Sequence, residues 1–111
     1  MGYYSQVGLC LEKKSFNELK KRLEKYDYML KDGFCTITVF DDVVICNWDC
    51  IKWYDFDEIN IIKNFLSELS EQEIDYSLVR IGEADEDVET QSCYNKGVCD
   101  RIGVYRGIDI Y

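Results

Sequence analysis

The chain has 111 residues and a formal net charge of −9, with 22 acidic and 13 basic residues and no histidine or proline. This length favours one domain, residues 1–111, that buries its own core. An aromatic fraction of 14% argues against an intrinsically disordered chain. Because acidic proteins repel phosphate backbones, the charge disfavours direct nucleic-acid binding and favours a basic partner protein or a cation.

The sequence predicts neither a signal peptide nor a membrane span. The opening Gly2-Tyr3-Tyr4-Ser5 is neither cationic nor apolar enough for a signal peptide. No stretch approaches the roughly 18 apolar residues of a membrane span. We therefore expect a cytoplasmic protein whose cysteines are reduced thiols.

The first third of the chain predicts a strand and a helix. Residues 3–12 alternate in the way that is typical of a half-buried strand. The capping box Ser15-Phe16-Asn17-Glu18 predicts the start of a helix that ends at Asp32-Gly33. The expected buried stripe of this helix is Phe16, Leu19, Leu23, Tyr26 and Leu30.

Residues 34–40 and 43–53 predict a β-hairpin around the two-residue turn Asp41-Asp42. The length of the turn fixes the register, so that Phe40 pairs with Val43. We expect the uniformly apolar face of the hairpin to point into the core, and this face carries Cys35, Ile37, Val39, Val44, Cys46 and Trp48.

A second helix is predicted to follow, with Asp55 or Asp57 as its N-cap. Its expected buried stripe is Ile59, Ile62, Phe65, Leu66 and Leu69. Further strands are predicted at residues 76–81, 87–94 and 104–111. This order predicts an α+β fold, namely a ferredoxin-like β-α-β-β-α-β antiparallel sheet with two helices on one face and extra C-terminal strands.

A dense group of carboxylates follows the strand at residues 76–81. Asp85, Asp87 and Glu89 have the spacing that opens a calcium loop, but Thr90 replaces the required glycine and Lys96 replaces the bidentate glutamate. We therefore expect no EF-hand and predict an acidic docking surface for a basic partner. Its residues are Glu83, Asp85, Glu86, Asp87 and Glu89, supported by Asp41 and Asp42. A solvated acidic loop and a looser Mg²⁺ or Ca²⁺ site are the alternatives.

Arg80 precedes this acidic group on the same predicted strand. Its guanidinium can bind a carboxylate or phosphate ligand, or it can clamp the acidic loop by pairing with Glu83 or Asp87. We favour the clamp. Trp53 and Tyr54 are expected to be partly exposed, and such aromatic residues carry much of the binding energy at interfaces.

Catalytic and metal motifs are incomplete. Without histidine, no Ser-His or Cys-His nucleophile can be assembled, and there is no glycine-rich phosphate loop. The cysteines include no C-x-x-C pair, although Cys93 and Cys99 flank a turn and can meet. We therefore expect a non-enzymatic protein with no cofactor and no metal, and buried free thiols.

The chain resembles a group of small proteins encoded by phages and prophages of Gram-positive bacteria. The resemblance lies in the opening M-G-Y-Y-S-Q-V, in W-D-C-I-K-W-Y and in Y-S-L-V-R-I-G-E-A-D-E-D-V-E. Small acidic phage accessory proteins are often inhibitors of host defence, including anti-CRISPR proteins. The resemblance thus implies a protein that binds a host defence protein or nucleoprotein complex by presenting carboxylates to a surface meant for nucleic acid.

Three other functions stay open at this point. One is a nucleotide-signal sponge that uses Arg80 and the exposed aromatic residues, either as a monomer or as a homo-oligomer. Another is a metal-binding accessory protein or a metal-dependent enzyme. The last is a structural or regulatory phage domain.

Overall fold

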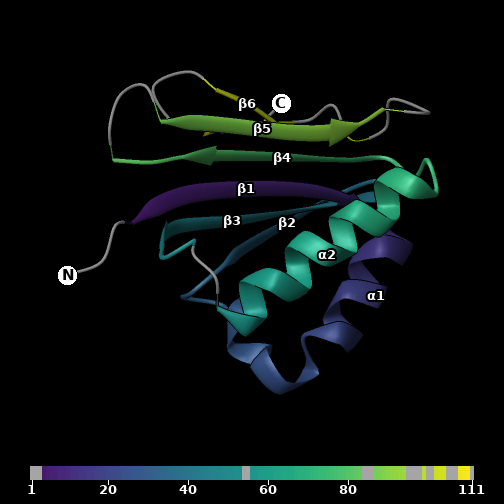
Figure 1. The fold of residues 1–111 in the computed structure, drawn as a ribbon, viewed down its shortest axis with the longest axis horizontal. Coiled ribbons are helices and arrows are strands. Elements are labelled where there is room, and N and C mark those ends of the chain that lie inside the picture. The colour runs from purple at the N-terminus through teal and green to yellow at the C-terminus, as the bar shows by residue number, and fades with distance from the viewer. Residues whose placement is uncertain are drawn as a thin grey trace.

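The computed structural model describes residues 4–53, 56–83, 87–94 and 99, and the backbone of 102–104 and 108–110. It is a small mixed α/β domain with a five-stranded antiparallel sheet and three helices (Figure 1). The elements are β1 (Ser5–Glu12), α1 (Lys13–Arg22), the 3-10 helix η1 (Glu24–Leu30), β2 (Thr36–Phe40), β3 (Val43–Ile51), α2 (Asp57–Glu71), β4 (Tyr76–Ile81), β5 (Val88–Cys93), β6 (Ile102–Val104) and β7 (Ile108–Ile110).

The sheet has the strand order β2-β3-β1-β4-β5, and every neighbouring pair is antiparallel. β1 therefore lies at the centre, and β2 and β5 form the two edges. Both α-helices lie on one side of the sheet, as Figure 1 shows. The predicted strand at residues 87–94 is confirmed as β5. The predicted strand at 104–111 is wrong, because β6 and β7 pair with each other as a separate two-stranded sheet.

The main core lies between the helices and the sheet. The predicted stripe of α2 is confirmed: Ile59, Ile62, Phe65, Leu66 and Leu69 are all buried. It packs in one cluster with Val7, Leu9 and Leu11 of β1 and with Trp48 of β3. Each such side chain contributes roughly 1.5–3 kcal/mol when it leaves water, so this face dominates the stability.

The strand β1 is buried on both faces, and the expectation of a half-buried strand is wrong. On the side away from the helices, Cys10 packs with Val43, Ile45, Val79 and Cys99. The Ser77 hydroxyl donates to the Cys99 carbonyl at 2.7 Å and so ties the C-terminal segment to β4. A second layer from the end of the chain therefore covers the centre of the sheet.

The helix α1 begins earlier than predicted. It starts at Lys13 directly after β1, with Glu12 at the N-cap position, and Ser15 is a buried residue inside the helix. No side-chain cap is formed at Glu12, so the capping-box prediction is wrong. The amide of Lys13 donates instead to the Asp42 carbonyl at 2.8 Å. A backbone group of the hairpin turn thus satisfies one of the free amides of the first turn.

The predicted first helix does not continue to residue 32. α1 ends at Arg22, and the 3-10 helix η1 follows with a non-helical residue, Tyr26, at φ −126°. This change brings Met29 into the core, where its carbonyl accepts a 2.7 Å hydrogen bond from the Trp48 indole. Gly33 has a φ of +95°, as expected of the residue that ends such a segment.

The N-cap predicted for the second helix is also wrong. α2 begins at Asp57, Phe56 holds the N-cap position, and no side-chain cap is formed there. Asp55 lies outside the described residues. Asp57 and Glu58 still place two acidic residues in the first turn, where negative charge is favoured.

The predicted register of the β2–β3 hairpin is confirmed from Phe40–Val43 to Ile37–Cys46. The prediction that its apolar face points into the core is confirmed for four of the six residues. Val44, Cys46, Trp48 and Cys35 are buried, but Ile37 and Val39 are 37% and 56% exposed. The helices pack against β1, β3 and β5. The edge strand β2 extends beyond their cover.

Candidate functional site

Arg80 clamps the base of the β4–β5 connection. Its Nη2 lies 2.7 Å from Asp87 Oδ1, and its Nε lies 3.0 Å from Glu89 Oε1. Its Nη1 also donates to the Ser5 hydroxyl at 3.2 Å. The hydrogen bond to Asp87 is the main reason that the pKa of Arg80 is raised. The clamp thus pairs two of the predicted docking carboxylates within the molecule.

Glu83 takes part in a different contact. It is exposed, and its Oε1 accepts a 3.0 Å hydrogen bond from the backbone amide of Tyr4. Of the two partners predicted for Arg80, Glu83 or Asp87, the structure confirms Asp87 and adds Glu89. Asp85 and Glu86 lie outside the described residues, so their predicted role stays a prediction.

Asp41 and Asp42 lie at the opposite end of the sheet from Glu83. Their turn follows the Glu12–Val43 pair, whereas the β4–β5 connection follows the Gln6–Ile81 pair. The six residue-to-residue steps of β1 from Gln6 to Glu12 span about 20 Å. The carboxylates of the predicted docking surface that the structure describes therefore form two separate groups, one at each end of the sheet.

Trp53 is not an exposed contact residue. It is 7% exposed, and its ring centroid lies 6.0 Å from that of Trp48. Its indole nitrogen is buried and has no hydrogen-bond partner among the described residues. The prediction of partial exposure is wrong for Trp53, because the end of β3 carries it under the start of α2. Tyr54 lies outside the described residues.

The structure brings together a site that the sequence did not predict, which we call the aromatic groove. It is a pocket of about 300 Å³ where the end of β3, the start of α2, η1 and the residue before β1 meet. Its walls are the aromatic side chains of Tyr4, Tyr28, Phe34 and Phe56. Met29, Ile51 and Ile59 are buried at its floor, and Cys50, Lys52 and Glu58 complete its lining.

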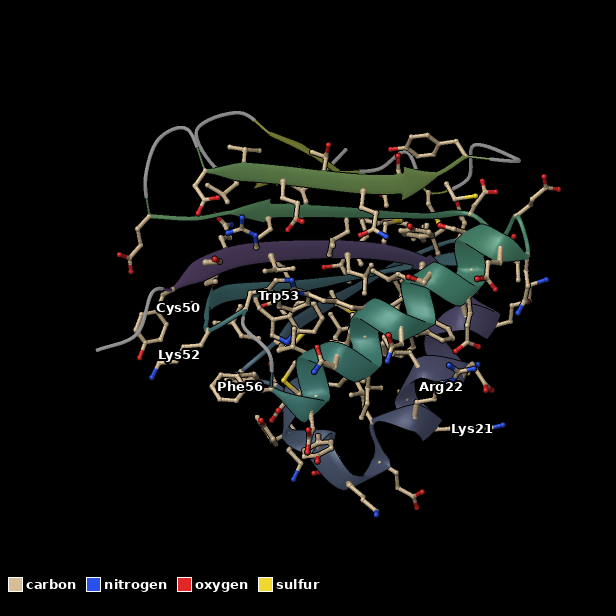
Figure 2. The ribbon with its side chains drawn as sticks, viewed as in Figure 1. Lys21, Arg22, Cys50, Lys52, Trp53 and Phe56 are labelled. Atoms are coloured by element: carbon tan, nitrogen blue, oxygen red, sulfur yellow. The ribbon has the colours of Figure 1, made fainter. Side chains whose placement is uncertain are left out.

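The four wall residues are between 40% and 46% exposed, although each has a large apolar surface. They are four of the nine exposed large hydrophobic residues found among residues 4–53, 56–83 and 87–94. Figure 2 shows the side chains of Cys50, Lys52 and Phe56 at this corner of the molecule. Contiguous exposed apolar surface of this kind is typical of a binding site.

Polar contacts hold the walls of the aromatic groove in place. The Tyr28 hydroxyl donates a short hydrogen bond to the Glu58 carboxylate, which is the main reason that the pKa of Tyr28 is raised to about 12. The Tyr28 ring meets Phe34 edge-on at 5.4 Å. On the other wall, Lys52 Nζ lies 5.5 Å from the centroid of the Tyr4 ring. The groove is therefore preformed.

The sequence contains a partial signal for these residues. Tyr4 and Phe56 each directly precede an element, and Phe34 lies two residues before β2, at positions where no periodic pattern requires burial. The sequence alone does not show that three aromatic residues near the ends of different elements are neighbours in space, because this depends on the topology. The residues could therefore be named as candidates for a surface site, but the aromatic groove could not be predicted.

Four of the six cysteines, Cys10, Cys35, Cys46 and Cys99, are buried, and all six are free thiols. The neighbouring thiol of Cys10 and burial raise the pKa of Cys99. Contact with Cys35 and burial likewise raise the pKa of Cys46. Cys50, by contrast, is exposed beside the groove. Within the described ranges, no three potential metal ligands come together.

A second, more polar hollow lies between α1 and α2. Arg22 of α1 pairs with the Glu68 carboxylate of α2 through both terminal nitrogens, and its guanidinium lies 4.9 Å from the Phe65 ring centroid. In Figure 2 the side chain of Lys21 points away from this contact. These contacts join the two helices and leave little of Arg22 free to bind a ligand.

No family model matches the chain, and no curated protein or solved structure matches it. Among the described residues, no helix combines the length and apolar character of a membrane span.

Proposed function

We propose that this chain is a non-enzymatic protein-binding domain that anchors its partner in the aromatic groove. The observation that carries the proposal is the gathering of four half-exposed aromatic rings around an apolar floor. Aromatic side chains that line a pocket are the residues that dominate binding energy at interfaces. Hydrogen bonding and ring contacts hold the groove ready, so little side-chain entropy is lost on binding.

The charge of the molecule favours a basic partner. The net charge is −9, and exposed Glu83 adjoins the groove through its hydrogen bond to the Tyr4 amide. Rim charges of this kind steer a partner of opposite sign and exclude partners of like sign. We therefore propose a partner with an apolar anchor side chain and positive charge around it.

A phage-encoded inhibitor of a host defence protein or nucleoprotein complex, acting in the cytoplasm, is the specific form of this proposal. Such a partner has a basic surface meant for nucleic acid, which an acidic protein can occupy. Its identity rests on the resemblance alone. The aromatic groove adds an anchor that a purely electrostatic nucleic-acid mimic would lack.

We assign the fold of this binding domain to the ferredoxin-like class. The order β2-β3-β1-β4 with antiparallel neighbours supports the assignment, as do two α-helices on one side of the sheet. In this assignment β5 is an addition beside β4, and the β6–β7 pair is a further one.

A small-ligand site is the second candidate, and the volume of the groove favours it. A pocket of about 300 Å³ lies at the lower end of the range for small-molecule sites. Arg80 does not serve this function, because Asp87 and Glu89 engage it. Native mass spectrometry would detect a nucleotide that co-purifies with the wild-type chain and is lost in Phe56→Ala.

The test is affinity capture from host lysate with three forms of the chain: wild type, Phe56→Ala and Tyr94→Ala. Tyr94 is a matched control, because it is an exposed aromatic residue outside the groove. We expect Phe56→Ala to weaken binding of the captured partner by about 2 kcal/mol, roughly thirtyfold in Kd. Tyr94→Ala should bind like the wild type. Equal binding by all three forms would contradict the proposal.

A further inference from the structure

The edge strand β2 is unusually open for pairing. It lies at one edge of the five-stranded sheet and has the sequence T-I-T-V-F, without any charged residue. In a hairpin with a two-residue turn, the residues beside the turn bond to each other, and the next residues direct their amides outward. Ile37 and Val39 therefore present their N–H and C=O groups at the free edge.

Natural proteins normally protect such an edge with lysine, proline, a bulge or a covering segment. The strand β2 has neither lysine nor proline, and its pairing with β3 is regular from Thr36 to Phe40. Ile37, Val39 and Phe40 are moreover exposed. An unprotected apolar edge of this kind is a template for strand addition.

This edge continues directly from the aromatic groove. Phe34, a wall of the groove, lies two residues before Thr36 at the start of β2. Exposed carboxylates flank the uncharged strand, with Asp32 near the groove and Asp41 and Asp42 at the turn. A strand laid along β2 would therefore meet negative charge at both of its ends.

We propose that β2 accepts an extended segment of the partner protein as an added strand of the sheet, and that this segment is basic at its ends and aliphatic or threonine-rich between them. The inference rests on the proposed function and deepens it by naming how the partner is held. Main-chain hydrogen bonds to Ile37 and Val39 supply affinity, while the flanking carboxylates select positive ends.

A second copy of this chain fits the edge less well. If two copies of β2 paired antiparallel about Thr38, Asp42 of one copy would oppose Phe34 of the other, two residues from Asp32. Acidic groups would meet at both ends, between two molecules that each carry a charge of −9. Charge complementarity thus favours a basic strand from another protein.

The test uses two synthetic peptides, K-K-T-V-T-V-T-K-K and E-E-T-V-T-V-T-E-E, titrated into the isotope-labelled full chain. Neither has a large anchor for the aromatic groove, so their binding reports on the edge alone. We expect the lysine peptide to shift the amide signals of Ile37 and Val39 and to slow their exchange. We expect the glutamate peptide to bind about fivefold more weakly at low salt, and salt to narrow the gap.

Two variants separate main-chain pairing from side-chain contact. Val39→Pro removes an outward amide that β3 does not use, so the hairpin should persist while peptide binding falls at least about tenfold. Val39→Thr keeps the amide and should bind within about threefold of the wild type. Chemical shifts of β1, β3 and β4 confirm that each variant is folded.

The outcomes distinguish this inference from the proposed function. Full peptide binding by Val39→Pro, or binding of neither peptide at millimolar concentration, overturns the strand-addition proposal. The groove proposal is tested separately, by the effect of Phe56→Ala on capture of the partner. If the chain dimerised with increasing concentration and Val39→Pro abolished this dimerisation, the edge would bind a second copy of the chain. The proposal that it binds a basic strand of another protein would then be overturned.

Discussion

The two edges of the sheet differ in what their side chains contact. On β5, Glu89 pairs with Arg80, and the Gln91 amide donates to the Tyr76 hydroxyl at 2.9 Å. The strand β2 carries no side chain that can form an ion pair, and three of its five residues are exposed and apolar. Side chains of β5 thus make polar contacts with β4, whereas β2 carries no charged side chain and exposes apolar ones.

The comparison shows that some charged residues stabilise the fold, whereas others lie beside a surface that is available for binding. Asp87 and Glu89 belong to an acidic run in the sequence, but they serve the β4–β5 connection. Asp41 and Asp42 look minor in the sequence, but they lie beside the open edge. The number of acidic residues in a segment is therefore a poor guide to its availability for a partner.

Removal of the Arg80 clamp should have the largest effect of the changes considered. Arg80→Ala leaves partly buried Asp87 and exposed Glu89 without their shared cation, so we expect a loss of about 2 kcal/mol in unfolding free energy. Urea denaturation measures this loss. Amide exchange should accelerate in β5 and stay unchanged in β2.

Arg22→Ala is the control for this prediction, because the Arg22–Glu68 pair is more exposed than the Arg80 clamp. It should destabilise the protein less than Arg80→Ala does. If exchange in β2 accelerated as much as in β5, the two edges would not be independent, and the comparison would fail.

Local pattern predicted those parts of the fold that depend on neighbours in sequence. The spacing of Ile59, Ile62, Phe65 and Leu69 gave the buried face of α2, and the two-residue turn gave the hairpin register. The start of α1 could not be predicted in this way. Its first amide is bound by the Asp42 carbonyl, which lies 29 residues from Lys13 in the chain.

In the candidate site, too, contacts between residues close in sequence could be predicted, whereas contacts between distant segments could not. The Arg80–Asp87 contact was predicted because both residues flank one short connection. The aromatic groove was not, because Tyr4, Tyr28 and Phe56 come from three distant segments that only the topology brings together. The exposure of Val39 was also missed, because alternation predicts which face a side chain lies on but not how far the helices extend over it.

A smaller effect is expected from the backbone at the β2–β3 turn. Asp41 has a φ of +49°, in the left-handed region that glycine adopts without strain. Asp41→Gly should therefore raise the unfolding free energy by about 0.5 kcal/mol. It also removes a carboxylate beside the edge, so the lysine peptide should bind about twofold more weakly.

Glu73→Gly is the matched control for this turn. Glu73 has a φ of +57° just after α2, where its amide and that of Ile74 bond to the Ser70 and Leu69 carbonyls. Glycine favours this position, so a gain of about 1 kcal/mol is expected with no change in peptide binding. Equal losses of peptide binding in both variants would show that Asp41 contributes only to general charge.

The smallest expected effect is on the ionisation of Tyr28, a wall of the aromatic groove, and it is absent at neutral pH. The hydrogen bond to Glu58, followed by burial, raises the pKa of Tyr28 to about 12, so the folded state favours the protonated phenol. This contribution to stability is complete below pH 10, where an unfolded tyrosine begins to ionise, and it is lost as the pH rises from about 10 to 12. Absorbance at the tyrosinate band should show a tyrosine with a midpoint near 12 that Tyr28→Phe removes. Glu58→Gln should bring its midpoint back towards 10. An unchanged midpoint in Glu58→Gln would mean that the carboxylate does not hold this wall, and that the groove is less preformed than the edge beside it.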